Sequence, residues 1–381
     1  MNAYKKLESL NDRCKYLFNI IQKDGPITKN ELIKKTNMKL TTLNRDVQIL
    51  INNKIVVETA IAESTGGRKP SLYDINPYEF YSVGIDISRT YIEIVITNLK
   101  IKIVAEKKLK DLCNIAENIP NCINALLKKA QIDKASIVGM GIGIVGGFDI
   151  AMLKDKLIQE FQIPIYIDNG ANAAAIGEYY FGLGKDKQNI AYINCGVGIR
   201  TGVISSGILI STINNSEDAF AHMIVDPQGE QCLCGNYGCV ESYASISKIT
   251  QKFIEEVKNQ GKEYLNKELD QMDYQYVCSL AESLAESKNN IARALIMNAA
   301  LHFGIGLANY IRLFNPQLII LSGPLIQYSQ LFYDECNKNA VEKCHIKDNS
   351  IIFNRGGYFK NKSMSVGASV MAIQRLTNSK E

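Results

Sequence analysis

Apolar side chains recur at helical spacing three times in the first 55 residues, and turn residues separate the three runs. The first run covers residues 14–21 and stops before Gly25 and Pro26, two residue types that end helices. Thr28 followed three positions later by Glu31 is a capping-box signature, so a second helix is predicted to begin there. The pattern therefore predicts a module of short helices at the start of the chain.

The third predicted helix, residues 40–52, has two different faces. Its apolar positions, which we expect to be buried, are Leu40, Leu43, Val47, Leu50 and Ile51. A helix, a tight turn and a second helix with a polar face are typical of the helix-turn-helix, whose second helix enters the major groove. Arg45 suits guanine, and Asn44 or Gln48 suits adenine. The candidate DNA-contacting residues of this helix are Lys39, Thr41, Thr42, Asn44, Arg45 and Gln48.

A predicted β-hairpin follows the three helices. Residues 55–61 and 71–75 have the composition of strands, and residues 63–68 between them form a turn. The hairpin would be the wing of a winged helix, with Arg68 and Lys69 at its tip reaching the DNA backbone or the minor groove. The alternative is a plain three-helix module whose charged face is only solvated.

Beyond Pro77 the pattern changes to alternating strands and helices. Strands are predicted at residues 81–87, 91–97, 137–144, 165–169, 190–194 and 318–323. A strand pair around an acidic residue, here Asp86, and a turn is how actin-like nucleotide-binding folds begin. We therefore expect an α/β fold of two lobes with a cleft between them. A helix over residues 292–309 is predicted to be core, with part of it available for a subunit contact.

Charge is distributed unevenly along the chain. The formal net charge is +4, and the first 80 residues hold 13 basic and 9 acidic residues, so the remainder is neutral. Residues 29–54 alone contain six basic and two acidic residues, enough for several phosphate contacts. The sequence lacks a signal-peptide pattern and a run of 18 apolar residues, which predicts a cytoplasmic protein with no membrane partner.

Three of the ten cysteines lie within eight residues, at positions 232, 234 and 239, and His222 stands ten residues ahead of them. Three thiolates and one imidazole are a common set of ligands for a closed, structural Zn²⁺ site. The alternative is three reduced core cysteines. His302 and His345 have no such neighbours and are predicted to be ordinary packed or surface residues.

Two longer motifs extend these observations. Residues 229–241 read G-E-Q-C-L-C-G-N-Y-G-C-V-E and match the pattern G-x-x-C-x-C-G-x-x-G-C-[LV]-E, while residues 169–178 match N-D-A-N-A-A-A-x-G-E except at one place. On these motifs, residues from about 81 to 375 resemble the ROK family (repressors, open reading frames and kinases). The winged helix in front resembles that of the family's transcriptional repressors, including those for xylose.

The resemblance implies an actin-like (ribonuclease H-like) two-lobed ATPase fold preceded by a winged helix-turn-helix domain. The expected domains are residues 1–78 for DNA binding, 79–185 for the first lobe with a C-terminal helix near 363–378, and 186–362 for the second lobe with the zinc loop. The implied function is repression of carbohydrate-utilisation genes by a homodimer or tetramer bound to double-stranded operator DNA.

Three departures from the family's kinases argue against catalysis. The position of their catalytic aspartate is Gly170, and geometry supplies no substitute for a missing base. The phosphate-binding turn Gly-Gly-Thr-Lys is replaced by residues 88–91, S-R-T-Y, and the hairpin G-T-G-I-G by residues 196–200, G-V-G-I-R. No catalytic residue and no ATP are therefore expected. A sugar kinase with an appended DNA module is the alternative.

The effector site is defined less sharply. Asn169, His222 and Glu241 stand where family members contact sugar hydroxyls, but Ala219 replaces a sugar-binding glutamate, and the connection between residues 149 and 163 is short. A monosaccharide such as xylose, a different effector and no effector all remain open, because Asn169 and Glu241 also suit structural roles. A scaffold that docks a phosphocarrier or transport protein is a third hypothesis.

Overall fold

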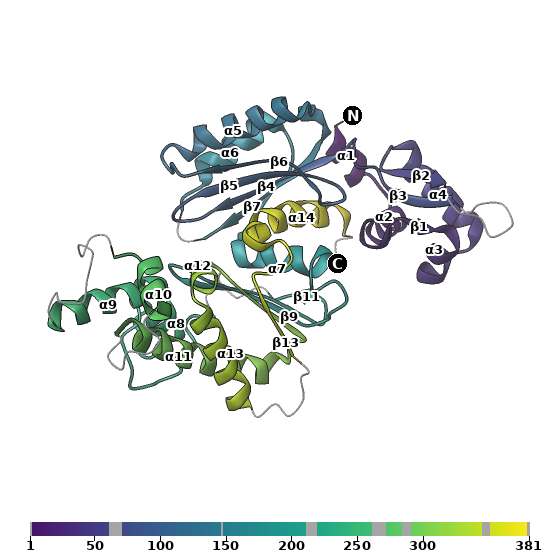
Figure 1. The fold of residues 1–381 in the computed structure, drawn as a ribbon. Helices are drawn as coiled ribbons and strands as arrows, with labels where there is room; N and C mark the ends of the chain where they lie inside the picture. Colours follow the sequence, from purple (N-terminus) through teal and green to yellow (C-terminus); the bar gives the residue numbers. More distant parts are fainter. Residues whose placement is uncertain are drawn as a thin grey trace. The chain divides into compact units, whose positions relative to one another are not determined.

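The computed structural model describes residues 2–60, 71–145, 148–210, 219–260, 272–283, 291–344 and 351–378 (Figure 1). The chain divides into two compact units, residues 1–181 with 364–381 and residues 182–363. Each contains a β-sheet and helices, which confirms the predicted α/β class.

The N-terminal module belongs to the first unit. Its elements are α1 (Ala3–Glu8), α2 (Asp12–Asp24), β1 (Ile27–Thr28), α3 (Lys29–Thr36), α4 (Leu40–Asn52), β2 (Val56–Ala60) and β3 (Ser71–Ile75). Thr28 and Glu31 cap α3 reciprocally as predicted, and α4 has the predicted bounds. The strands form an antiparallel sheet in the order β1-β3-β2. Helices α2 to α4 with this hairpin confirm the predicted winged helix-turn-helix.

Of the five predicted core positions of α4, Leu40 is wrong and Ile51 is only half-buried. Leu43, Val47 and Leu50 are buried, whereas Leu40 is 52% exposed. The reason is helical geometry, because residues four apart share a face, and Leu40 lies on the stripe that also carries the exposed Asn44. The start of α4 therefore presents an apolar side chain to solvent.

The first unit is built around a five-stranded sheet in the order β6-β5-β4-β7-β8. Its strands are β4 (Tyr81–Ile87), β5 (Ile92–Asn98), β6 (Ile103–Leu109), β7 (Ile137–Ile144) and β8 (Ile165–Asn169). Helices α5 (Ile115–Ala130) and α6 (Ala151–Phe161) cover one face, and α7 (Gly170–Phe181) and α14 (Ser363–Thr377) lie on the other (Figure 1). The final helix of the chain thus completes the first unit.

The packing of α14 requires glycine in two strands. A Cβ atom at Gly84 of β4 would lie 1.9 Å from the Ser365 carbonyl oxygen, and one at Gly141 of β7 would lie 1.8 Å from the Ala368 carbonyl oxygen. Any side chain at these positions would collide with helix backbone, which cannot move as the end of a flexible side chain can.

The N-terminal module is joined to the sheet of the first unit by one buried and one exposed polar contact. Gln22 of α2 donates from Nε2 to the Leu99 carbonyl oxygen at 2.7 Å. Lys100 forms an ion pair with Asp74 of β3. These contacts explain why the module and the first sheet fall into one compact unit.

The second unit holds a sheet in the order β11-β10-β9-β12-β13. Its strands are β9 (Ile190–Cys195), β10 (Ile199–Ser205), β11 (Ile208–Leu209), β12 (Leu318–Ser322) and β13 (Ile352–Arg355). Its helices are α8 (Val240–Ala244), α9 (Ile246–Gln260), α10 (Tyr274–Ser283), α11 (Ile291–Phe314), α12 (Pro324–Tyr328) and α13 (Gln330–Cys344).

Helix α11 is the core helix of the second unit. Its buried side chains, among them Ile296, Phe303 and Leu307, belong to the hydrophobic cluster that packs against the sheet. By length and composition it is the one helix of the described residues that passes as a membrane span, yet half of its most apolar window is buried inside the unit. This burial agrees with the predicted core role of residues 292–309.

Candidate nucleic-acid interface and metal centre

Helix α4 presents the predicted polar face to solvent. Lys39, Thr41, Asn44, Arg45 and Gln48 are exposed, and Thr42 is half-buried. Gln48 donates from Nε2 to Asn52 Oδ1 at 2.9 Å, which orients its amide along the helix. The two wing-tip residues predicted to touch DNA, Arg68 and Lys69, lie outside the described residues.

The structure adds two residues, Leu40 and Arg13, to this surface and places Asp46 beneath it. Leu40 is exposed in the first turn of α4, where an apolar side chain suits the methyl group of thymine. Arg13 of α2 and Arg45 both donate from Nε to the buried Asp46. The four-residue spacing of Leu40 and the polar Asn44 could have indicated that Leu40 is exposed. The contact between Arg13 and Asp46 has no signature in the sequence.

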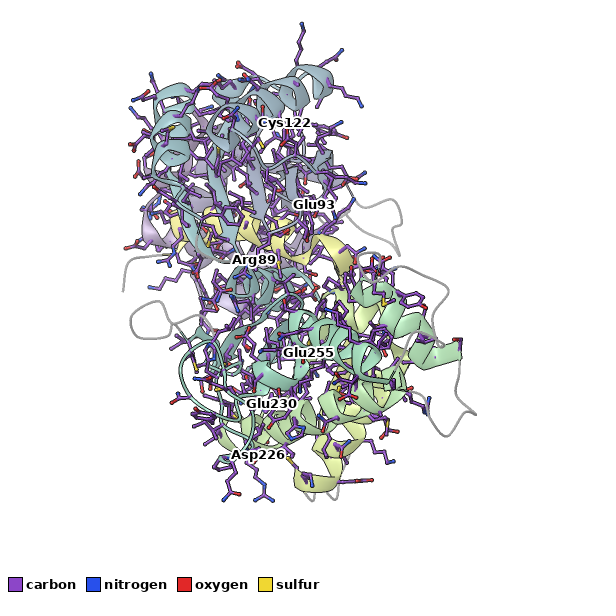
Figure 2. All side chains as sticks on the ribbon, turned by 90° about the vertical axis from the view of Figure 1, so that its left-hand side faces the viewer. Arg89, Glu93, Cys122, Asp226, Glu230 and Glu255 are labelled. Atoms are coloured by element: carbon purple, nitrogen blue, oxygen red, sulfur yellow. The ribbon has the colours of Figure 1, made fainter. Side chains whose placement is uncertain are left out.

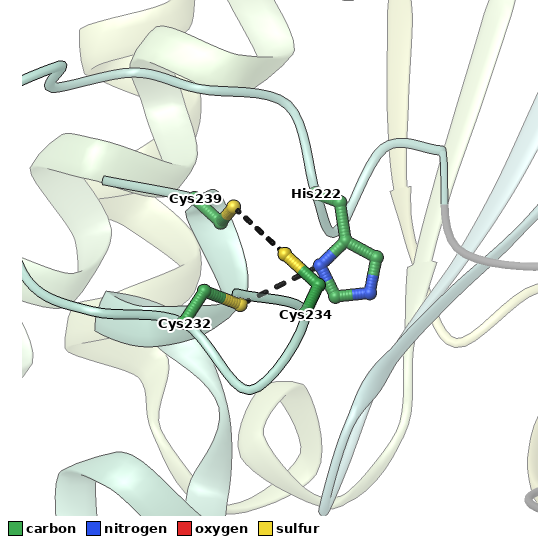
Figure 3. A group of neighbouring side chains, drawn as sticks. All are labelled: His222, Cys232, Cys234 and Cys239. Carbon is green, nitrogen blue, oxygen red and sulfur yellow. Dashed lines mark hydrogen bonds between the residues drawn. The ribbon is translucent and has the colours of Figure 1, made fainter. Parts of the chain in front are cut away.

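The four predicted metal ligands come together in the second unit (Figure 3). The ligand atoms of His222, Cys232, Cys234 and Cys239 all lie within 4.8 Å of one another. Cys232 Sγ is 3.5 Å from His222 Nδ1, and Cys234 Sγ is 3.7 Å from Cys239 Sγ. In a tetrahedral zinc site two sulfurs lie about 3.8 Å apart, and a sulfur and a nitrogen about 3.5 Å apart. These two pairs therefore have the spacing of a tetrahedral metal site, and the four ligand atoms are close enough together to hold one ion.

The loop that carries the cysteines is held by its own backbone. Cys232 N donates to the Asn236 carbonyl oxygen at 2.8 Å, and Gly238 N donates to the Glu230 carbonyl oxygen at 2.7 Å. Gly238 has a φ of 71°, and a Cβ atom there would lie 1.5 Å from the Asp226 carbonyl oxygen. Glycine is thus required just before Cys239 for the loop to close around the cluster.

The three cysteines of this loop differ in their thiol pKa. Burial raises the pKa of Cys239 to about 12 and also raises that of Cys232. The Asn236 backbone N–H lowers the pKa of Cys234. Buried thiols resist ionisation unless a cation is present, and a bound metal ion supplies that charge.

Glu241 connects the metal cluster to the turn between β9 and β10. Its Oε2 lies 3.8 Å from Nε2 of His222, and its Oε1 accepts a hydrogen bond from Ile199 N at 3.2 Å. Arg200 Nη1 lies 3.6 Å from the same Oε1 and donates to the Ile199 carbonyl oxygen. A metal ligand whose second nitrogen faces a carboxylate is oriented by it, so Glu241 stands directly behind the cluster.

Arg200 also lies against the hairpin of residues 196–200, which the sequence compares with a phosphate-binding hairpin. A Cβ atom at Gly198 would lie 2.8 Å from Arg200 Nη1 and 2.7 Å from Glu241 Oε1. Arg200 is buried, with 7% of its surface exposed. The guanidinium therefore occupies space beside the hairpin backbone and neutralises a protein carboxylate there.

The start of α7 is closed around Gly170. A Cβ atom at this position would lie 3.0 Å from Met364 Sδ and 3.1 Å from Val145 Cγ2, so an aspartate would require its surroundings to shift. Asp168 Oδ1 accepts from Asn172 Nδ2 at 2.8 Å, and Asn169 Oδ1 accepts from Ala171 N at 2.6 Å. Both side chains thus stabilise the first turn of the helix, the structural role left open for Asn169.

The turn after β4 is closed by its own hydrogen bonds. Ser88 donates from both its N–H and its hydroxyl to the Tyr91 carbonyl oxygen at 3.0 Å. Arg89 is exposed on this turn, and Glu93 lies on the next strand (Figure 2). Asp86 precedes the turn and is fully buried, and its carboxylate oxygens have no hydrogen-bond partner among the described residues.

The Asp86 carboxyl group is expected to make stability depend on pH. Burial, with the neighbouring Glu93 charge adding to it, raises the pKa of Asp86 from 3.8 to about 7. The stability that comes from keeping this group neutral is fully present below about pH 4 and is lost as pH rises through 7. Asp86→Asn should therefore be more stable than wild type at pH 8, by a few kcal/mol, with the difference shrinking towards pH 4.

Chemical denaturation of Asp86→Asn at pH 5 and pH 8 measures this effect. Asp155→Asn, which removes an exposed carboxylate on α6, is the control and should follow wild type. An Asp86→Asn variant whose advantage over wild type is the same at both pH values would contradict the expected ionisation.

The remaining histidines have no metal-binding partners in the described residues. The His302 ring stacks on Tyr243 with centroids 3.7 Å apart, and its Nδ1 lies 2.9 Å from the Asn298 carbonyl oxygen. Tyr243 in turn donates to Asp226 of the cysteine loop at 3.0 Å. His302 is thus a packed residue, as predicted, and it supports the loop. His345 lies outside the described residues.

The protein combines a winged helix-turn-helix, an α/β region with two sheets and a Cys₃His cluster. This combination is the class of protein that the sequence motifs predicted. The model of the ROK family matches residues 82–375. The chain belongs to the ROK family.

The chain is similar both to regulators and to kinases of this family. The chain is 30% identical to the xylose repressor of Bacillus subtilis over 336 residues, 82% of each chain. It superposes on a ROK-family transcriptional regulator, a homologue of the E. coli MLC protein, with a TM-score of 0.78 and 20% identity over 98% of this chain and 97% of that one. It also superposes on a ROK glucokinase from Streptomyces griseus with a TM-score of 0.62 and 25% identity, covering 77% and 99%. The predicted actin-like fold with a winged helix is thereby confirmed.

Proposed function

We propose that this protein is a DNA-binding transcriptional repressor of carbohydrate-utilisation genes, whose hold on its operator is modulated by a small effector. The observation that carries the proposal is the exposed polar face of α4, the second helix of a helix-turn-helix. The relative at 30% identity is a xylose repressor, which supports a sugar-linked role. We place the protein in the cytoplasm, where it meets double-stranded operator DNA as a homodimer or tetramer.

The Cys₃His cluster is the proposed site of one structural zinc ion. His222, Cys232, Cys234 and Cys239 supply the ligand types and spacing that Zn²⁺ prefers. Four protein ligands leave no open position for water, so the ion would hold the loop and not act on a substrate. Zinc is thus proposed as the only cofactor.

The protein is proposed to have no kinase activity. Gly170 stands at the base position, where even a Cβ atom would need Met364 and Val145 to shift, and Asp168 accepts a hydrogen bond from the Asn172 side chain. Arg200 fills the hairpin that would receive a phosphate. A coupled ATP-turnover assay with a panel of sugars tests this proposal, and sugar-dependent turnover would refute it.

The effector is proposed to be a monosaccharide, with xylose first among the candidates. Asn169, His222 and Glu241 are the proposed contacts. The domain boundaries are proposed separately, at residues 78, 185 and 362. His222 and Glu241 lie side by side within the second unit, and Asn169 belongs to the first. Burial of placed polar groups allows such a site to reject ligands that lack a matching hydroxyl.

Selection of bound DNA from a random pool tests the proposed function directly. The full-length, zinc-loaded protein is expected to enrich one sequence motif, and an inverted repeat in it would fit a symmetric dimer. The selected duplex is then competed with a sugar panel, and release by one sugar identifies the effector. Failure to enrich any sequence would remove the DNA-binding proposal.

Arg45→Ala is expected to weaken binding to the selected duplex by about 1–3 kcal/mol, because a bidentate contact from arginine to guanine contributes that much discrimination. Binding to unrelated duplexes should fall much less. Fluorescence anisotropy on the two duplexes measures both losses. Lys258→Gln, which removes an exposed charge on α9 of the second unit, is the control. Equal losses on both duplexes for Arg45→Ala would contradict base readout.

A further inference from the structure

A buried carboxylate lies directly beneath the DNA-facing surface of the winged helix. Asp46 belongs to α4, is 0% exposed, and bonds two arginines at once. Arg13 Nε donates to Asp46 Oδ2 at 2.8 Å, and Arg45 Nε donates to Asp46 Oδ1 at 3.2 Å. Each oxygen of the carboxylate therefore serves a different arginine.

Helix α2 is fixed against α4 at this point. Cys14, the residue after Arg13, directs its Sγ to the Asp46 carbonyl oxygen at 3.7 Å in a buried contact. The carboxylate and the carbonyl group of one residue thus both bond neighbouring residues of α2. The start of α2 is held beside the second turn of the recognition helix.

Each arginine bonds Asp46 through Nε, so its two terminal nitrogens are not used in that bond. A guanidinium has five N–H donors, and Nε supplies only one of them. The two terminal nitrogens form the planar pair that binds guanine or a phosphate through two hydrogen bonds. The side chains of Arg13 and Arg45 are 52% and 62% exposed, and their terminal nitrogens have no protein partner in the described part of the chain. Both are anchored at one end and accessible at the other.

Electrostatics explains how two guanidinium groups can be neighbours. Burial raises the pKa of Asp46, but the hydrogen bonds from Arg13 and Arg45 outweigh it, and the pKa lies below its ordinary value. The carboxylate is therefore charged and offsets the repulsion between the two cations. The trio keeps one net positive charge at the surface.

Stability alone is a weak reason for this arrangement. Replacing a buried ion pair with well-packed apolar residues is often neutral or stabilising, because desolvation of the charges offsets their attraction. What a fixed carboxylate provides is orientation, since a long arginine side chain held at Nε loses its freedom before it meets DNA.

We propose that Asp46 is a positioning residue for DNA recognition, holding Arg45 towards a base edge in the major groove and Arg13 towards a backbone phosphate at the rim of that groove. This inference rests on the proposed function and adds Arg13 as a DNA-contacting residue. The major groove is about 12 Å wide, so a cation that shares one carboxylate with a base-reading arginine lies within reach of the rim.

Two variants test the phosphate contact of Arg13 and the positioning role of Asp46 separately. Arg13→Gln, tested on the selected duplex between 50 and 200 mM salt, should reduce the magnitude of the salt slope by about 0.9 and weaken binding to all sequences alike. Asp46→Asn should lower the preference for guanine at the position that Arg45 reads by about fivefold or more, as judged by a repeated selection. Lys258→Gln, which changes the net charge as Arg13→Gln does, should leave both quantities at the wild-type values.

The outcomes distinguish this inference from the proposed function. If wild type enriches no sequence, the regulator proposal itself fails. If wild type enriches a motif but Arg13→Gln keeps the wild-type salt slope, the phosphate contact is refuted, and Asp46→Asn with an unchanged base preference refutes the positioning role. Should Asp46→Asn not fold, Asp46→Glu replaces it, because it keeps the negative charge but moves the carboxylate that holds Arg45, and an unchanged preference for guanine would refute the positioning role.

Discussion

Removal of zinc is expected to unfold the cysteine loop and to lower the thermal midpoint of the full-length protein by about 10 °C or more. Metal binding contributes on the order of 10 kcal/mol to small zinc domains, and a loss of about 4 kcal/mol shifts the midpoint of a unit of this size by roughly 10 °C. The loop is expected to depend on the ion because the metal would join His222 to the three cysteines, whose ligand atoms all lie within 4.8 Å of one another, and its removal takes away these bonds. Calorimetry with and without a chelator measures the shift.

Cys239→Ser is the genetic form of the same experiment. It should purify with substoichiometric zinc and show the lowered midpoint without chelator. Cys113→Ser is the matched control, because Cys113 is exposed and belongs to the first unit. A Cys239→Ser protein that retains one zinc per chain and the wild-type midpoint would contradict the proposed ligand set.

The metal cluster could be predicted because its ligands are close in the sequence. A loop of a few residues brings positions 232, 234 and 239 together whatever the rest of the chain does, and His222 precedes them by ten residues. The helix-turn-helix was predictable for a related reason, since caps such as Thr28 with Glu31 act within one helical turn. Local determinants fix both features.

Contacts between distant segments left no such signal. Arg13 and Asp46 are 33 residues apart, and Asn19 of α2 donates to the Thr377 carbonyl oxygen across 358 residues. The spacing of Leu40 gives two opposite signals, because it shares a stripe with the buried Leu43 and Val47 and also with the exposed Asn44, and the packing of α4 decides between them. Roles that depend on packing must come from the structure.

The residues proposed to contact an effector show the same limit. Asn169 bonds the backbone of α7, and Glu241 bonds Ile199 N and stands behind His222. The sequence motif predicted which residues would contact an effector. It did not predict that Asn169 and Glu241 each bond other groups of the protein. A sugar at this site would have to exchange hydrogen bonds with these partners or use their remaining polar atoms.

Gly141→Ala is expected to prevent the first unit from folding, although it adds a single methyl group. The Cβ atom would lie 1.8 Å from the carbonyl oxygen of Ala368 and 2.5 Å from its carbonyl carbon, distances that real Cβ contacts essentially never show. Relief would require α14 to move off the sheet, which would expose the buried Val366 and Val370 on that helix. Overpacking of a flexible core costs about 1–3 kcal/mol, and a collision with fixed helix backbone should exceed that range.

Gly139→Ala provides a control two residues away on the same strand. Its Cβ atom would make ordinary contacts, 3.5 Å from the Pro164 carbonyl oxygen and 3.6 Å from Ala372 Cβ. Soluble yield and urea denaturation should therefore separate the two variants, with Gly139→Ala close to wild type. If both variants fold with equal stability, α14 does not pack on β7, and the final helix would not belong to the first unit. Because α14 also meets α2 through Gln374 and Gln22, loss of this packing should release the winged helix from the sheet.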